Sequence, residues 1–101
     1  MDKRRSGKSS ALGDKGKTPD PLLAFIGTKI RDGRESSGVS QDRFSFAAEI
    51  ERAYYGSVER GKRNLTVATL VKIAVAQGVD PAKLLPTLEQ AKKLLPKPSG
   101  K

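Results

Sequence analysis

The sequence predicts an all-α fold, and three observations support this prediction. Apolar residues recur at i, i+3 and i+4 in several segments, which is the period of a helix with one buried face. Ser, Thr or Asp precedes most of these segments, and each of these residue types can cap a helix. No segment alternates apolar and polar residues clearly enough to predict a strand. We therefore expect a compact domain of five helices over residues 20–85.

The two ends of the chain differ in composition from its centre. Residues 1–19 are rich in Lys, Gly and Ser, so they cannot bury a core, and we expect a disordered basic arm. Such an arm would either keep the protein in solution or touch DNA phosphates and the minor groove. Residues 86–101 should hold a C-terminal helical extension, from Thr87 to Leu95, and a basic disordered tail.

The first helix of the central domain should begin at Asp20-Pro21. Aspartate is a good helix cap, and proline fits the first helical position. The helix should end near Ser36. Its buried face would consist of Leu22, Leu23, Ile26 and Ile30.

Residues 40–64 predict two short helices joined by a tight turn and followed by a basic loop. Ser40 can cap the first of these helices and Glu51 the second. On the second helix, Tyr55 and Val58 should face the core of the domain. The opposite, outward face would carry Arg52, Ala53, Gly56, Ser57 and Arg60. An exposed helical face with Arg at its start and a basic loop at its end suits insertion into a DNA groove.

The rest of the domain repeats the same start and stop signals. Thr66 predicts the cap of a fourth helix that ends near Gln77, before Gly78. Asp80-Pro81 repeats the cap-plus-proline start and predicts a short fifth helix.

The pattern SQ at 40–41 and VERGKRN at 58–64 resembles that of a known family. Further matching residues are Ala48, Ile50, Arg52, Tyr54 and the helix after Thr66. On these residues the chain, from Leu22 to Leu85 without gaps, resembles the Cro/repressor (Xre-type) helix-turn-helix family, and especially restriction–modification controller proteins. Two positions depart from the family pattern, which usually has Ala at Ser45 and Gly at Glu49. A left-handed Glu49 in the turn would cost about 1–2 kcal/mol, although we still expect the turn.

The resemblance and the chemistry of the residues together predict a DNA interface. Arg52 can donate two hydrogen bonds to guanine O6 and N7, and its alternative roles are a phosphate contact or a solvated charge. The residues expected at base edges are Arg52, Ala53, Tyr54 and Ser57. Tyr54 would otherwise pack on the domain. The residues expected at phosphates are Gln41, Arg60, Lys62, Arg63 and Asn64. Arg34 and Glu59 match a structural ion pair of the family, between the first and third helices.

Composition excludes several classes of function. The chain has no Cys and no His, which excludes disulfides, Cys- or His-based metal sites and Ser-His-Asp or Cys-His catalysis. Neither GxGxxG nor GxxxxGK[ST] occurs. We expect no enzymatic activity, no metal and no cofactor. No apolar run is long enough to span a membrane and no signal peptide is evident, so a cytoplasmic protein is expected.

The formal net charge of +9 favours a polyanionic partner. Combined with the motif, it predicts a sequence-specific regulator of transcription that binds double-stranded DNA as a homodimer on a palindromic operator. Bound at its operator, such a regulator would block or recruit polymerase. The alternatives are an antitoxin-like protein with a toxin partner, or a module that serves protein contacts only. The surplus apolar residues expected at the dimer interface are Leu84, Leu85, Leu88, Ala91, Leu94 and Leu95.

Overall fold

The structure is a computed structural model that describes residues 20–96, so the predicted basic arm and tail lie outside the described residues. Its elements, in chain order, are α1 (Pro21–Ser36), α2 (Gln41–Ala48), α3 (Arg52–Glu59), α4 (Val67–Gln77), the 3-10 helix η2 (Pro81–Leu84) and α5 (Leu88–Leu94). No strand occurs within residues 20–96. The predicted all-α fold is confirmed.

Each α-helix begins at a side chain that caps it. Asp20, Ser40, Glu51, Thr66 and Thr87 each accept a hydrogen bond from a backbone N–H in the first turn of the helix that follows. These bonds satisfy donors that have no partner inside the helix. The helix starts expected from the sequence are therefore confirmed, and the reason is local chemistry.

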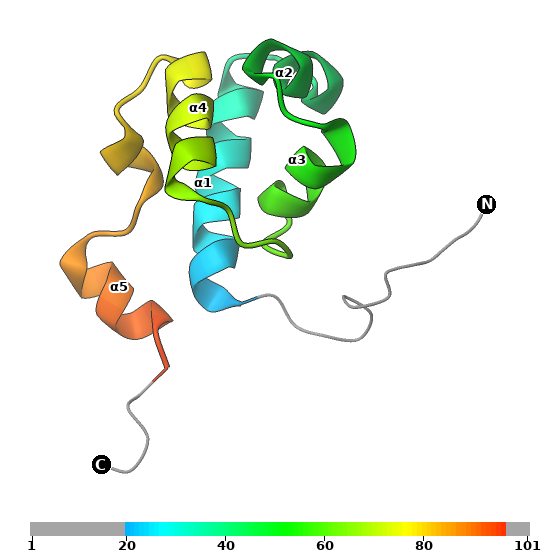
Figure 1. Ribbon diagram of the computed structural model, residues 1–101. Helices are drawn as coiled ribbons and strands as arrows, with labels where there is room; N and C mark the ends of the chain where they lie inside the picture. Colours follow the sequence, from blue (N-terminus) through cyan, green and yellow to red (C-terminus); the bar gives the residue numbers. More distant parts are fainter. Residues whose placement is uncertain (1–19, 97–101) are drawn as a thin grey trace.

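The helices surround one apolar core. Figure 1 shows α1 at the centre, with α2 and α3 on one side of it and α4 alongside; α1 packs against α3 and α4, and α2 packs against α3 and α4. The buried apolar residues are Ile26, Ile30, Phe44, Ala48, Tyr55, Val58, Leu70, Ile73, Ala74 and Leu84. Every one of the first four helices, together with η2, contributes to this core, so α3 is held in a fixed position.

The segment after α4 differs in part from the prediction. The expected fifth helix is one 3-10 turn, η2, and Leu85 after it is extended because it precedes Pro86. Leu84, at the end of η2, is only 3% exposed and belongs to the core. Its assignment to a dimer interface is therefore wrong, since it is not available to a second copy.

The turn between α2 and α3 has the geometry expected for it. Glu49 adopts the left-handed conformation, with φ 59° and ψ 47°. Two backbone hydrogen bonds close the turn, from Glu49 N to Phe46 O at 3.1 Å and from Ile50 N to Ser45 O at 2.9 Å. Ser45 is buried, and its hydroxyl donates to Asp42 O at 3.2 Å, so it leaves no polar group without a partner.

The end of α3 lies unusually close to α1. A Cβ atom on Gly27 of α1 would lie 2.5 Å from the carbonyl oxygens of Val58 and Glu59. A Cβ atom on Gly61, which has φ +73°, would lie 2.7 Å from the Cα atom of Ala24. Here backbone packs against backbone, so the sequence positions α3 through glycines that admit no side chain.

We expect Gly27→Ala to lower the free energy of unfolding by about 1–3 kcal/mol, because the backbone atoms that the new methyl group meets cannot move aside separately. Gly33→Ala in the same helix is the matched control. Its methyl group would meet only the amide end of the Gln77 side chain, so we expect a change within about 1 kcal/mol. Urea unfolding of both variants measures the difference; equal losses would contradict the role given to Gly27.

Candidate nucleic-acid interface

The predicted base-contacting residues lie on α3 in different environments. Arg52 and Ala53 are exposed at its start, whereas Tyr54 and Ser57 are half-buried. The Ser57 hydroxyl donates to Ala53 O at 3.1 Å, so its hydrogen is used within the helix and only its lone pairs face a ligand. Arg52 is therefore the strongest donor among these four residues.

Arg52 has a partner that the sequence analysis missed. Its Nε donates to Oδ1 of Asp42, on α2, at 2.7 Å, and the two side chains are 48% and 81% exposed. The two residues are ten positions apart and come together only because the turn at Glu49 folds α3 back toward α2. No local sequence pattern indicated this pair, because it depends on how α2 and α3 meet.

Gly56 lies beneath two guanidinium groups. A Cβ atom there would be 2.8 Å from Nη1 of Arg52, 3.3 Å from Nη1 of Arg60 and 3.8 Å from Oε1 of Gln41. Gly56 has the outward position expected from the helix period, yet it is buried because these side chains cover it. Because Gly56 has no side chain, the guanidinium groups of Arg52 and Arg60 have room to lie over it.

The loop after α3 is braced by Tyr54. The Tyr54 hydroxyl donates to Asn64 O at 3.3 Å, and the Arg63 guanidinium lies 5.5 Å from the centre of the Tyr54 ring. A cation at this distance over an aromatic ring is attracted to it. Arg63 and Asn64 are exposed and Lys62 is half-buried. Tyr54 thus holds the loop in place, and its predicted base contact stays a prediction.

Arg34 and Glu59 form a buried, two-pronged ion pair. Nε and Nη2 of Arg34 donate to the two carboxylate oxygens of Glu59 at 2.6 and 3.1 Å. The side chains are 9% and 1% exposed. Arg34 also donates to Val39 O at 2.7 Å, and Nε2 of Gln41 donates to Glu59 at 2.8 Å. Gln41 therefore uses one amide hydrogen inside the protein, and its predicted phosphate contact would use the other or its backbone N–H.

The charges of this pair are fixed by their surroundings. Burial acts to raise the pKa of Glu59, but the hydrogen bond from Arg34, the neighbouring Tyr55 hydroxyl and the bond from Gln41 together hold this pKa below its ordinary value. The hydrogen bond to Glu59 raises the pKa of Arg34. Burial raises the pKa of Tyr55, whose hydroxyl has no partner of good hydrogen-bond geometry among residues 20–96. Glu59 is thus ionised, and the positive charge of Arg34 balances its negative charge. Its carboxylate therefore does not repel an anion at the end of α3.

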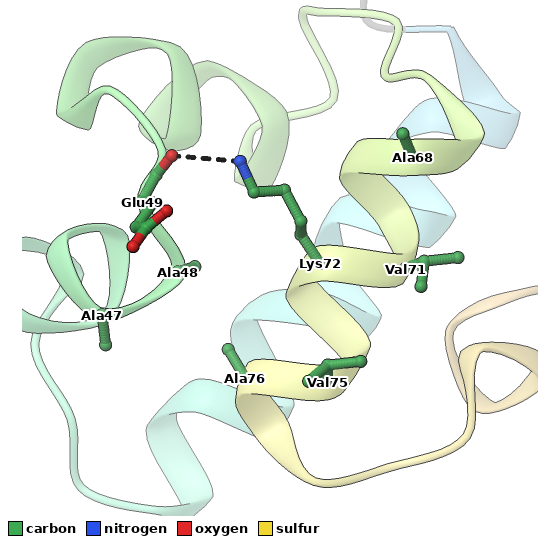
Figure 2. Close-up of a pocket in the computed structure, with 8 residues that line it drawn as sticks. All are labelled: Ala47, Ala48, Glu49, Ala68, Val71, Lys72, Val75 and Ala76. Carbon is green, nitrogen blue, oxygen red and sulfur yellow. Dashed lines mark hydrogen bonds between the residues drawn. The ribbon is translucent and has the colours of Figure 1, made fainter.

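A second surface feature lies between α2 and α4. It is a shallow groove of about 560 Å³ with a mainly apolar lining. Its lining consists of Ala47, Ala48, Glu49, Ala68, Val71, Lys72, Val75 and Ala76 (Figure 2). The Lys72 ammonium group donates to Glu49 O at 3.2 Å across the groove. Val75 is 71% exposed, so this surface offers apolar contact rather than anion binding.

Two further features, a cluster of metal-binding side chains and a membrane-spanning helix, are absent from the part of the molecule that the structure describes. No group of three or more Asp or Glu side chains there could hold a metal ion. No helix of residues 20–96 combines the length and the apolar character that crossing a membrane requires.

Comparison with known proteins agrees with this geometry. A family model described as "Helix-turn-helix" (HTH_3) matches residues 30–84. The chain belongs to this helix-turn-helix family. The match includes the whole of α2, the turn, α3, the basic loop and α4, which is the part that forms the candidate interface.

Relatives within the helix-turn-helix family include restriction–modification proteins. The control protein C.BamHI of Bacillus amyloliquefaciens is 40% identical over 65 residues, which cover 63% of this chain and 80% of the relative. The controller protein C.AhdI of Aeromonas hydrophila has a solved structure that is 35% identical and superposes with a TM-score of 0.61, covering 62% of this chain and 96% of that one. The predicted resemblance to controller proteins is confirmed.

A further solved structure to which the chain is similar is that of the master regulator for biofilm formation SinR, in complex with DNA. It is 27% identical, with a TM-score of 0.57, over 58% of this chain and 95% of that one. The names of these relatives describe control proteins and regulators, and none describes an enzyme.

In this helix-turn-helix protein, alanine at either Arg34 or Glu59 should cost about 3–5 kcal/mol of stability, because it leaves a buried charge without its partner. The double variant should lose less than the sum of the two single losses. Denaturant unfolding of the four proteins gives the coupling energy. Glu89 and Lys92, an exposed pair at 3.8 Å, are the control and should show almost no coupling. Additive losses for Arg34 and Glu59 would mean that the buried pair does not interact.

Proposed function

We propose that the protein is a sequence-specific regulator of transcription that binds double-stranded DNA. The observation that carries this proposal is a group of cations on α3 and its loop, namely Arg52, Arg60, Lys62 and Arg63, beside a Glu59 carboxylate that Arg34 neutralises. Cations clustered on one helix and the loop after it attract the phosphate backbone and release counterions on binding. That SinR was solved with DNA supports the same use of this fold.

The proposed binding mode assigns different tasks to the helix and the loop. The exposed start of α3 would enter the major groove, where Arg52 donates to guanine O6 and N7. Ala53 would offer an apolar contact to a thymine methyl group, and Ser57 only a weak polar contact. Residues of the loop and Gln41 would contact phosphates, which orient the protein but carry no sequence information.

Selection from a random pool of duplexes tests the proposal, since it yields a motif only if binding is sequence-specific. With that motif, Arg52→Ala should lose discrimination at one base pair of each half-site, by about 5- to 150-fold. Arg63→Ala should weaken binding to all sequences alike and reduce the slope of affinity against salt. Titrating both variants against matched and mismatched duplexes separates the two tasks. Equal losses on both duplexes for Arg52→Ala would contradict base contact.

The apolar residues around α5 support a homodimer. Leu85, Leu88 and Leu95 are 42%, 71% and 53% exposed, and Ala91 is half-buried. α5 packs against α1 but contributes no fully buried residue to the core. Exposed leucines on so small a domain favour contact with a second copy across a two-fold axis. Such a dimer would place two α3 helices about 34–36 Å apart on a palindromic operator.

We expect Leu88→Glu to abolish the dimer, since a charge would replace an apolar contact. Val75→Glu, at an equally exposed position in the groove between α2 and α4, is the matched control and should leave the dimer intact. Light scattering at tens of micromolar measures the mass of each variant. A wild-type protein that is monomeric at this concentration, and binds a palindrome no better than a half-site, would contradict the dimer.

The groove between α2 and α4 favours a second candidate function, contact with another protein such as a toxin or polymerase. Its apolar lining includes Val71 and Val75, and it lies outside α3 and the basic loop. Salt titration distinguishes the candidates. Affinity for duplex DNA that falls steeply with salt supports DNA binding, whereas weak binding without this slope would leave protein contact as the better explanation.

A further inference from the structure

Two residues to which no DNA contact was assigned, Asp42 and Gly56, hold the side chain of Arg52 in place. Asp42 accepts a hydrogen bond from its Nε at 2.7 Å, and Gly56 leaves the space into which its Nη1 extends. We propose that Asp42 and Gly56 are positioning residues that present Arg52 to a guanine base. This inference rests on the proposed function, because it concerns how the same site distinguishes DNA sequences.

The hydrogen bond that Arg52 donates to Asp42 determines which edge of the guanidinium is available. Arginine has five N–H donors, and Asp42 occupies the single one on Nε. Within residues 20–96, the Nη1 and Nη2 groups of Arg52 donate no hydrogen bond. They are a pair of parallel donors, which is the arrangement that guanine O6 and N7 require. Asp42 thus orients the side chain without using the two nitrogens that the base needs.

Gly56 supplies the space for this orientation. Any side chain at this position would bring a carbon atom within 2.8 Å of Nη1 of Arg52 and 3.3 Å of Nη1 of Arg60. The Arg52 guanidinium would have to shift, and that of Arg60 would have to give by a few tenths of an ångström. The two like charges share this site, and the Asp42 carboxylate offsets their repulsion at Arg52. The carboxylate of Glu51, next to Arg52 in the sequence, accepts instead from Tyr54 N as the cap of α3.

The same geometry has one rival interpretation, in which Arg52 and Arg60 together bind a phosphate. The two interpretations differ in what they predict for sequence discrimination. A phosphate contact contributes equally to all sequences, whereas a base contact contributes only to the matched one. The ratio of affinities for matched and mismatched duplexes therefore decides between them.

The experiment uses the full chain, the duplex motif selected by the wild-type protein, and the same duplex changed at the base pair that Arg52→Ala identifies. Asp42→Ala should reduce the ratio of the two affinities by about fivefold or more. Removing a negative charge should also strengthen binding to any DNA, so the ratio is more informative than either affinity. Asp80→Ala is the matched control: it removes the same charge from an exposed residue that makes no side-chain cap bond, and it should leave the ratio unchanged.

Gly56→Ala tests the inference without the loss of a charge. Alanine is the better helix former, so the melting temperature should stay the same or rise while the affinity ratio falls. Loss of discrimination in a protein that is at least as stable cannot come from unfolding. This opposite change in stability and discrimination is the result expected of a positioning residue.

The outcomes separate this inference from the proposed function. If the wild-type protein selects no motif, both are contradicted. If it selects a motif and Arg52→Ala loses discrimination, but Asp42→Ala and Gly56→Ala both keep the full ratio, only the positioning role is overturned. If these variants lose affinity equally on matched and mismatched duplexes, the phosphate interpretation replaces it.

Discussion

The buried ion pair between Arg34 and Glu59 joins three parts of the fold. Arg34 comes from α1, Glu59 ends α3, and Gln41 reaches the same carboxylate from the start of α2. Arg34 also donates to Val39 O, in the segment that connects α1 to α2. A buried pair of this kind adds little over a well-packed apolar pair, but removal of one partner leaves a charge that the protein cannot solvate. The arrangement of α1, α2 and α3 therefore depends on both residues together.

Close backbone contacts also help to position α3. Gly27 allows α1 to reach the last carbonyl groups of α3, and Gly61 allows the next loop to reach Ala24. At the other end of α3, the turn at Glu49 sets its angle to α2, at a conformational cost of about 1–2 kcal/mol that the two backbone bonds of the turn help to offset. The position of α3 is thus determined at both of its ends, and this in turn fixes where its outward side chains lie.

The sequence predicted the features that local chemistry controls. The caps and the helix bounds follow from residues within four positions of one another, so their patterns are visible without the fold. The left-handed turn at Glu49 was expected from the resemblance to the family, which usually has Gly at this position. The burial of Leu84 was not predictable in this way, because it depends on the direction in which η2 leaves α4. The same holds for Asp42 beside Arg52 and for the cover over Gly56, which arise only when two helices meet.

The contacts of the interface side chains have a consequence for entropy. Arg52 is held by Asp42, and Arg63 lies over the Tyr54 ring. Immobilising a long, flexible side chain at an interface costs about 0.5–1.5 kcal/mol. In this protein part of that ordering accompanies folding rather than complex formation, since the restraining partners lie within the same domain. The surface that meets a ligand is therefore already partly ordered in the free protein. Binding then costs less side-chain entropy than it would if all of the arginines at this surface were mobile.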